Sequence, residues 1–139
     1  MRGKSPQPKD EEYHFGDGVI ISEADTNGVI TYVNKKFCQI TGYDKSELLG
    51  KKYKIIHHPD MPKEIFDEIW DTIRAGENWN GLIKNLRKDG RYYWTHTYVE
   101  PIEKNGEITG YLAIHRQASE SEIKDAKIKY LQLKNKERK

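Results

Sequence analysis

The chain contains 139 residues, which is the length of one domain with a single hydrophobic core. Its 24 basic and 22 acidic residues give a net charge of +2, and this balance excludes a general electrostatic attraction to nucleic acid. A single cysteine, Cys38, excludes an internal disulfide and a cysteine metal cluster.

The amino-terminal region has no pattern typical of export. Residues 1–12 contain two prolines and mixed charges without an apolar core, and the sequence has no apolar run of about 18 residues that would span a membrane. Together with the lone cysteine, these features predict a cytoplasmic protein. We expect residues 1–17 to form a flexible or capping segment ahead of the fold.

A hairpin is predicted next. Two β-rich runs, Val19-Ile20-Ile21 and residues 29–33, flank Asp25-Thr26-Asn27-Gly28, and the Asn-Gly pair is a strong signal for a tight turn. Such a pair of runs joined by a tight turn predicts two antiparallel strands.

Short helices follow the hairpin. Asn34 is placed to cap a helix over residues 35–41, and residues 46–50 predict a further helical turn. Two prolines then break the chain before residues 63–75, where apolar side chains recur at helical spacing. This longer helix must cover an apolar surface.

The second half of the sequence changes to a period of two. The runs 79–87, 91–102 and 107–117, separated by Gly-containing turns, predict three antiparallel strands. Ser119 and Glu122 form a capping-box pattern that starts a terminal helix. The predicted fold class is therefore α+β, a five-stranded antiparallel sheet with short helices on one face and a C-terminal helix.

The terminal segment, residues 119–139, allows two interpretations. Its apolar residues Ile123, Ala126, Tyr130 and Leu133 have the spacing of a short coiled-coil seam, which is typical of a signalling, linker or dimer helix. The same residues are equally suited to packing against the domain itself.

One face of the predicted strand over residues 79–87 combines an indole ring, a glycine without a side chain and an amide. Trp79, Gly81, Ile83 and Asn85 alternate along the strand, and this set suits a planar heteroaromatic ligand through stacking, close approach and edge hydrogen bonds. The alternative is an ordinary core face on which Asn85 is paired with the backbone.

The order of elements and several motifs resemble the PAS domain family over residues 18–118. The motifs are Asn34, Phe37, Thr41-Gly42-Tyr43, Glu47-Leu48 and Gly50, followed by Arg87-Lys88-Asp89-Gly90, Tyr93-Trp94, Pro101-Ile102, Gly106-Glu107-Ile108 and Gly110-Tyr111. Within the family, two segments resemble the sensor domain of bacterial aerotaxis receptors: residues 57–62, His-His-Pro-Asp-Met-Pro, and residues 79–94. The resemblance implies noncovalent FAD and a redox signal passed to a chemotaxis receptor or another signalling partner.

The resemblance also implies a set of cofactor-binding residues. They are His57, His58, Asp60, Trp79, Ile83, Asn85, Tyr93, Thr95 and Leu112. It points Tyr93, Thr95, Thr97 and Val99 inward, with Leu112 and Ile114 of the last strand, and leaves Tyr92, Trp94, His96 and Tyr98 as an outer aromatic stripe. That stripe is either an exposed contact surface or is covered by the terminal helix or the N-terminal segment.

The sequence departs from the resemblance at informative positions. His57 stands where the family often carries arginine, so a titratable ring replaces a permanent charge. The light-sensing flavin branch would have glutamine where Leu112 stands and a reactive cysteine where Tyr53 stands, so covalent photochemistry is not expected.

Other interpretations remain open at this point. His58 and Asp60 also suit a turn, with Asp60 as the cap of the helix over 63–75. A haem-binding gas sensor with His57 or His58 as axial ligand, and a cofactor-free dimerisation module, are the alternative functions. The sequence lacks a Ser/His/Asp order, a phosphate-binding glycine loop and zinc-ligand spacing, so an enzyme is not expected.

Overall fold

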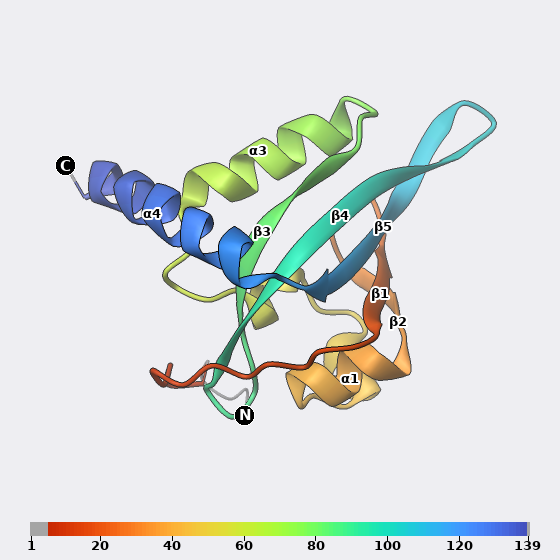
Figure 1. The fold of residues 1–139 in the computed structure, drawn as a ribbon. Helices are drawn as coiled ribbons and strands as arrows, with labels where there is room; N and C mark the ends of the chain where they lie inside the picture. The colour runs from red at the N-terminus through yellow and green to blue at the C-terminus, as the bar shows by residue number, and fades with distance from the viewer. Residues whose placement is uncertain (1–5, 139) are drawn as a thin grey trace.

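The computed structural model describes residues 6–138, so the first five residues of the predicted lead-in lie outside the described residues. The elements are β1 (Val19–Ala24), β2 (Ile30–Val33), α1 (Lys35–Thr41), α2 (Lys45–Leu48), the 3-10 helix η1 (Tyr53–Ile56), α3 (Lys63–Arg74), β3 (Trp79–Leu86), β4 (Tyr92–Lys104), β5 (Glu107–Gln117) and α4 (Glu120–Glu137). They form one antiparallel sheet with the helices around it, which confirms the predicted fold class (Figure 1).

The strand order places the last strand at the centre of the sheet. In the order β2-β1-β5-β4-β3, strand β5 pairs with β1 on one side and with β4 on the other. His115 of β5 therefore lies opposite both Ile20 of β1 and Thr97 of β4. This pairing joins the strands from the two halves of the sequence into one sheet.

Local signals in the sequence fix the short elements. The Asn34 side chain accepts a hydrogen bond from the Phe37 backbone N–H at 3.0 Å, and Gly42 ends α1 in the left-handed region with φ of 83°. In the β1–β2 turn, Gly28 has φ of 82°, a conformation that favours glycine. The predicted hairpin and helix α1 are therefore confirmed.

The helices are divided between the two faces of the sheet. Helices α1, α2, η1 and α3 lie on the inner face, defined here as the face of Thr95 and Thr97, whereas α4 packs on the outer face over Trp94 (Figure 1). Helix α4 then continues past the edge strand β3 to the start of α3, where Glu137 Oε2 accepts a hydrogen bond from the Glu64 backbone N–H at 3.4 Å.

The N-terminal segment lies against the beginning of β4. The Tyr13 backbone N–H donates to the Tyr92 carbonyl oxygen at 2.7 Å, and the Tyr92 N–H donates to the Glu11 carbonyl at 3.1 Å. The Arg87 guanidinium lies 3.9 Å from the centre of the Tyr13 ring. The described part of this segment is thus a cap on the sheet.

The outer aromatic stripe is covered where it meets α4. Trp94 is 3% exposed and its ring stacks on Tyr130 with the ring centres 6.2 Å apart. Of the two alternatives for the stripe, cover by the terminal helix is the one found at Trp94, because Ile123, Ala126 and Tyr130 of α4 are buried on the domain. Those three residues are consequently not free to form a coiled-coil seam, and the alternative of packing on the domain is confirmed.

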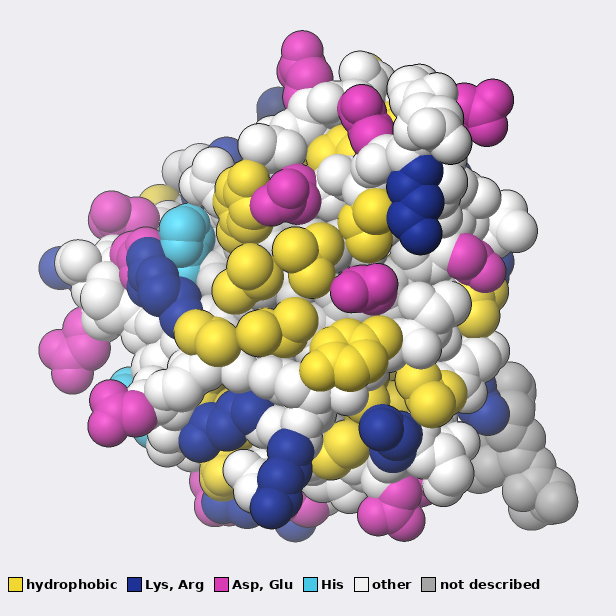
Figure 2. Space-filling view, turned by 90° about the vertical axis from the view of Figure 1, so that its right-hand side faces the viewer, with side chains coloured by type: hydrophobic (Ala, Val, Ile, Leu, Met, Phe, Trp, Pro, Cys, Tyr) yellow, Lys and Arg dark blue, Asp and Glu magenta, His cyan; other side chains and the backbone are white. Residues whose placement is uncertain are grey.

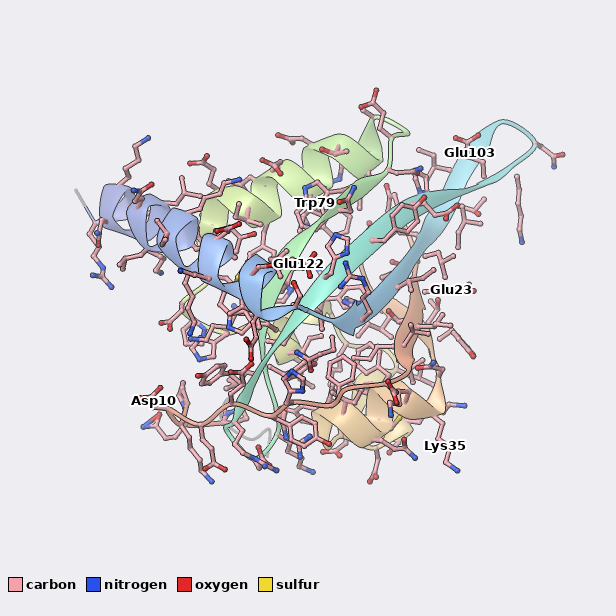
Figure 3. The ribbon with its side chains drawn as sticks, viewed as in Figure 1. Asp10, Glu23, Lys35, Trp79, Glu103 and Glu122 are labelled. Atoms are coloured by element: carbon pink, nitrogen blue, oxygen red, sulfur yellow. The ribbon has the colours of Figure 1, made fainter. Side chains whose placement is uncertain are left out.

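The side that carries β1, β2 and the β4–β5 hairpin has apolar side chains gathered among charged ones (Figure 2). Val19 of β1 and Tyr32 of β2 are among the exposed large apolar side chains of the described residues. Glu103 lies at the far end of β4 (Figure 3). Scattered exposed apolar side chains among charged ones are ordinary on a protein surface.

The cover of α4 over Trp94 makes a quantitative prediction. Trp94→Ala is expected to lower the free energy of unfolding by about 3–5 kcal/mol, because it removes a buried aromatic side chain and leaves a cavity. Tyr98→Ala, on the same strand face beyond α4, is expected to cost about 1 kcal/mol or less. Urea unfolding of both variants checks this, and equal losses would contradict the packing of α4.

Candidate functional site

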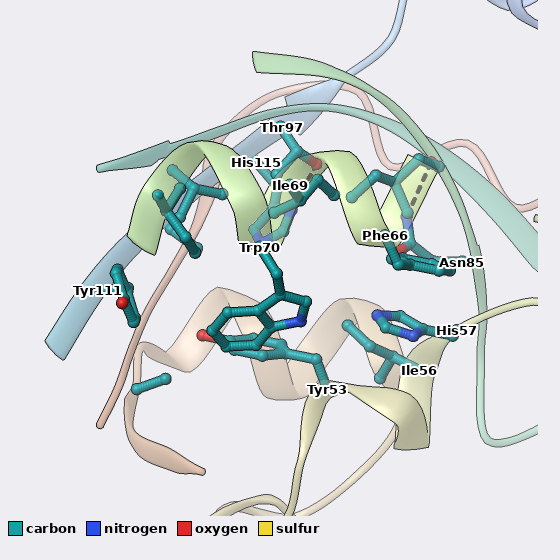
Figure 4. A pocket seen from close by; sticks show the side chains of 15 residues that line it. Tyr53, Ile56, His57, Phe66, Ile69, Trp70, Asn85, Thr97, Tyr111 and His115 are labelled. Atoms are coloured by element: carbon teal, nitrogen blue, oxygen red, sulfur yellow. Dashed lines mark hydrogen bonds between the residues drawn. The ribbon is translucent and has the colours of Figure 1, made fainter. Parts of the chain in front are cut away.

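A pocket lies between the inner face of the sheet, α3 and η1. The space between its walls is about 630 Å³, a figure that includes the solvent at its open mouth. Its lining consists of Ala24, Tyr53, Ile56, His57, Phe66, Ile69, Trp70, Ile73, Ile83, Asn85, Thr97, Val99, Tyr111, Ala113 and His115 (Figure 4).

The walls of the pocket are mostly apolar. Helix α3 contributes Phe66, Ile69, Trp70 and Ile73, whose spacing places them on one helix face. On the sheet, the small side chains of Ala24 and Ala113 leave room in front of β1 and β5. The rings of Trp70 and Tyr111 meet edge to face with their centres 5.7 Å apart. Flat aromatic and aliphatic walls of this kind suit a planar ligand.

A chain of polar side chains crosses the floor of the pocket. The Asn85 Nδ2 donates to Thr95 Oγ1 at 3.0 Å, Thr95 Oγ1 lies 2.9 Å from Thr97 Oγ1, and Thr97 Oγ1 lies 2.8 Å from His115 Nδ1. Asn85 Nδ2 also donates to the carbonyl oxygens of Ile83 and Tyr93. The four side chains are buried, and their mutual hydrogen bonds offset the cost of removing them from water.

His115 ends this chain at the pocket. Its Nε2 is buried and has no hydrogen-bond partner among the described residues. An unpaired buried donor or acceptor costs about 1–3 kcal/mol. Burial lowers the pKa of His115 from 6.5 to about 4, so the ring is neutral at pH 7.

His57 enters the pocket from the end of η1. Its ring stacks on Phe66 with the ring centres 3.9 Å apart and the planes 16° apart, and its backbone pairs with Asn85 at an isolated bridge. Burial, with smaller contributions from His115 and Lys54, lowers the pKa of His57 to about 4. The ring is therefore neutral at pH 7 and does not supply the charge of an arginine.

Tyr53 forms part of the pocket wall beside β1. Its hydroxyl lies 2.7 Å from Ser22 Oγ. Burial raises the pKa of Tyr53 to about 12, so this side chain stays a neutral hydroxyl at physiological pH. A cysteine thiolate is absent from this position, in keeping with the sequence.

Two predicted site residues lie on the other side of the His57 loop. His58 Nδ1 accepts a hydrogen bond from the Asp60 backbone N–H at 3.0 Å, and Asp60 Oδ2 pairs with Lys84 Nζ at 2.8 Å. Neither side chain lines the pocket. Asp60 does not cap α3 either, because Pro62 is the N-cap and makes no side-chain bond. These contacts hold the loop to strand β3.

Three further predicted residues flank the pocket. Trp79 lies at the start of β3 (Figure 3), and its Nε1 donates to Glu68 Oε2 of α3 at 2.8 Å. Thr95 lies behind Asn85 as its hydrogen-bond partner, and Tyr93 is buried where the sheet meets α1. Among the predicted set, Ile83, Asn85 and His57 thus line the pocket directly.

The inward direction predicted for Leu112 and Ile114 is wrong. The β5 residues that line the pocket are Tyr111, Ala113 and His115, so strand alternation places Leu112 and Ile114 on the outer face. The error is a shift of one residue in the phase of β5. It also means that an inward position of that strand carries the imidazole of His115.

The pocket residues that the sequence analysis did not assign come mainly from α3 and β5. The helical spacing predicted an apolar face on α3 but not which surface it covers. Thr97 was predicted to point inward, and because a buried hydroxyl needs a hydrogen-bond partner, that prediction is a signal for the polar chain. Among residues 6–138 no cluster of three or more metal-ligating side chains is found, and none of the helices is long and apolar enough to cross a bilayer.

Comparison with known proteins defines the family. Residues 30–115 match the family model described as the PAS fold, and the chain belongs to this family. The aerotaxis receptor of Escherichia coli (strain K12) is 39% identical over 107 residues, which are 77% of this chain and 21% of the receptor. The chain thus spans about one fifth of that relative's length.

Two other matches support this assignment. The nitrogen fixation regulatory protein of Klebsiella pneumoniae is 35% identical over 104 residues, covering 74% of this chain and 21% of that protein. The solved PAS domain of a protein from Colwellia psychrerythraea is 29% identical, with a TM-score of 0.66 over 72% of this chain and 86% of that one. The protein is therefore a PAS sensor domain related to the aerotaxis receptor.

The buried histidines predict a pH dependence of stability. The unfolded chain binds protons near pH 6.5, whereas folded His57 and His115 bind them only near pH 4, so the free energy of unfolding falls as the pH drops through this interval. Each ring contributes a loss of about 2 kcal/mol between pH 7.5 and pH 5.

This dependence is measured by urea unfolding at the two pH values. His115→Gln is expected to reduce the loss by about 2 kcal/mol, because glutamine does not titrate. His14→Gln, at an exposed position, is the matched control and is expected to leave the loss unchanged. An unchanged loss in His115→Gln would show that this ring is not held neutral by the fold.

Proposed function

We propose that the domain binds FAD in the pocket and acts as a redox or oxygen sensor that passes its state to a signalling partner. The single observation that carries the proposal is an apolar, aromatic-walled pocket crossed on one side by hydrogen-bonding groups that end in an unpartnered His115 Nε2. The resemblance to aerotaxis receptors supports flavin as the ligand. A flavin ring has the same division into flat faces and a polar edge.

The pocket residues fit such a ring. The side chains of α3 and the opposing sheet would enclose its faces, while the Asn85 amide and His115 Nε2 would meet hydrogen-bonding atoms on its edge. A bound flavin supplies reversible electron transfer. The protein's part is to exclude water with its apolar walls and to hold fixed polar groups at the ring edge, which changes in charge and protonation when its redox state changes.

The choice of FAD rests on the resemblance. FAD carries two phosphates, and His57 is neutral at pH 7 where the resemblance to the family implies an arginine. We therefore propose that His57 contacts the ligand by packing and hydrogen bonding and does not neutralise its phosphates. The phosphates are proposed to be neutralised by groups outside the pocket lining.

The route to a partner is proposed to run through the His57 loop and α4. The loop that starts at His57 is held to β3 through Lys84, and Lys134 Nζ of α4 donates to the Pro59 carbonyl at 3.2 Å. A change at the ligand that moves this loop would alter how α4 packs against the domain. Helix α4 presents Ile128 and Leu131, 56% and 61% exposed, to a signalling protein or a second copy.

Haem is the second candidate ligand, because His57 is a neutral imidazole inside the pocket and neutral imidazole is the form that binds iron. His58, the other histidine considered for this role, lies outside the pocket lining. A cofactor-free dimerisation module is the third candidate function. The absorption spectrum of the purified protein distinguishes a flavin sensor, a haem sensor and a cofactor-free module.

Purified protein incubated with FAD and desalted is expected to be yellow, with a flavin spectrum that bleaches under dithionite and returns in air. The reason is the fit of the pocket walls to a planar ring. A colourless protein that also takes up no FMN would contradict the proposal, and a haem spectrum after incubation with haemin would support the second candidate instead.

The polar edge of the site is tested by a pair of variants. Asn85→Ala is expected to weaken FAD binding about tenfold, because a ligand hydrogen bond and its supporting network are lost. His58→Gln is the matched control and is expected to bind FAD within about twofold of the unmodified chain. Equal losses measured by fluorescence titration would assign His58 a direct role.

Blue light is expected to leave the FAD complex without a long-lived bleached adduct. The reason is that Tyr53 stands at the position of the reactive cysteine, and Cys38 on α1 is not part of the pocket lining. Absorption recorded after a light pulse checks this, and bleaching that disappears in Cys38→Ala would overturn it.

A further inference from the structure

The His115 imidazole is the polar group that the proposed function leaves least explained. Among the described residues, two buried side-chain polar atoms lack a hydrogen-bond partner, Trp94 Nε1 and His115 Nε2. Trp94 is covered by α4, whereas the His115 ring lines the pocket beside Thr97 (Figure 4). His115 Nε2 is itself covered in this structure, but of the two unpaired atoms it is the one that belongs to a residue of the pocket lining.

The hydrogen atoms along the polar chain have a preferred direction, and the distances from Thr95 Oγ1 to its two acceptors set it. An amide nitrogen only donates, so Thr95 Oγ1 accepts from Asn85 Nδ2. The single Thr95 hydroxyl hydrogen then has two acceptors in reach: Thr97 Oγ1 at 2.9 Å and the Ile83 carbonyl at 3.5 Å. The shorter bond is the stronger, so Thr95 donates to Thr97.

This direction continues to the imidazole. Thr97 Oγ1 already accepts from Thr95, so its own hydrogen points to His115 Nδ1 at 2.8 Å. Nδ1 therefore acts as an acceptor. Since burial keeps the ring neutral at pH 7, its one hydrogen is on Nε2, the atom without a partner.

We propose that His115 is a specificity-determining residue of the pocket, held as the Nε2–H tautomer by the hydroxyls of Thr95 and Thr97, and that it donates a hydrogen bond to an acceptor atom of the bound ring. This inference rests on the proposed function for the identity of the ring as a flavin. The acceptor is a ring nitrogen or a carbonyl oxygen. Thr95 and Thr97 are positioning residues, because they act through His115.

The proposal includes a direction of selectivity. A ligand that presents an N–H at the same place needs His115 Nε2 as an acceptor, and the whole chain must then reverse. In the reversed chain Thr97 donates to Thr95, and the Thr95 hydrogen is left with the Ile83 carbonyl at 3.5 Å. The reversed arrangement ends on the weakest bond of the network, so the pocket favours acceptor edges over donor edges.

The tautomer is tested first in ligand-free protein. Two-dimensional long-range proton–nitrogen NMR of protein labelled with 15N-histidine, at pH 7, is expected to show His115 protonated at Nε2. Thr97→Val removes the hydroxyl that fixes Nδ1 as an acceptor, and a mixture of tautomers is expected. Protonation at Nδ1 in the unmodified chain, or an unchanged pure Nε2–H form in Thr97→Val, would overturn the relay.

The donor role is tested by FAD titration of two His115 variants. His115→Leu removes the donor and is expected to weaken binding about tenfold, whereas His115→Gln supplies an amide N–H and is expected to restore most of that loss. Ile114→Val, on the opposite face of β5, is the control expected to bind like the unmodified chain. Equal affinities of Leu and Gln variants, both weak or both unchanged, would overturn the donor role.

The two experiments separate this inference from the proposed function. If the unmodified chain binds no FAD, the proposed function fails, and the NMR measurement still decides whether Thr95 and Thr97 fix the His115 tautomer. If FAD binds and His115 is protonated at Nδ1, the proposed function stands and the inference fails.

Discussion

The pairing of β5 between β1 and β4 is the constraint on which the rest of the structure depends. It places His115 beside Thr97 and brings Ala24 and Ala113 together in front of the sheet. Large side chains at the two alanine positions would fill the space that α3 leaves open. The inward residues of β5 are Tyr111, Ala113 and His115, so a small side chain lies between two larger ones. The pocket exists because of this order and because β1 and β4 pair with β5 in the observed register.

The pocket and the outer helix are coupled through shared elements. Strand β3 carries Ile83 and Asn85 inward and Leu82 outward, and the carbonyl of Leu82 accepts a hydrogen bond from the Tyr130 hydroxyl of α4 at 2.6 Å. The same strand holds the His57 loop through Lys84. A ligand that contacts Asn85 or changes the hydrogen bonds of its partner Thr95 thus acts on a strand to which α4 is also bonded. Coupling of this kind needs two arrangements of the polar chain, and the two threonine hydroxyls supply them.

The sequence was sufficient for most of the fold, for reasons that are local. Asn34, Gly42, Gly28 and the Ser119–Glu122 box each act on neighbouring backbone groups, so their effect is visible without the rest of the chain. The 3-10 helix η1 had no such signal, because its few residues carry no period. Its position depends on packing under α1 and β3.

The site was predictable in part, and the missing part is nonlocal. Asn85 and Ile83 follow from alternation within β3, whose phase is fixed by Trp79 and Gly81 at its start. The phase of β5 that was taken with the resemblance was wrong by one residue, and composition did not reveal the error, because Leu112 and Ile114 are more apolar than Ala113 and His115. Pairing with β1 and β4, together with the space needed under α3, decides the phase instead, and no short segment carries that information.

The covered state of Trp94 has the same origin. The stripe of aromatic residues on β4 and the apolar spacing of α4 were both visible in the sequence, but each was compatible with an external partner. The structure pairs them with each other through the Trp94–Tyr130 stack, and the output surface moves to the far side of α4.

The most direct test of the central claim, that the pocket is a flavin site with His115 at the ring edge, is a crystal structure of the protein with FAD. The account predicts the ring system between α3 and the inner face of the sheet, with His115 Nε2 within hydrogen-bond distance of a ring acceptor and its Nδ1 still bonded to Thr97. A ring bound elsewhere, or a ring in the pocket with His115 turned away from its edge, would contradict the account.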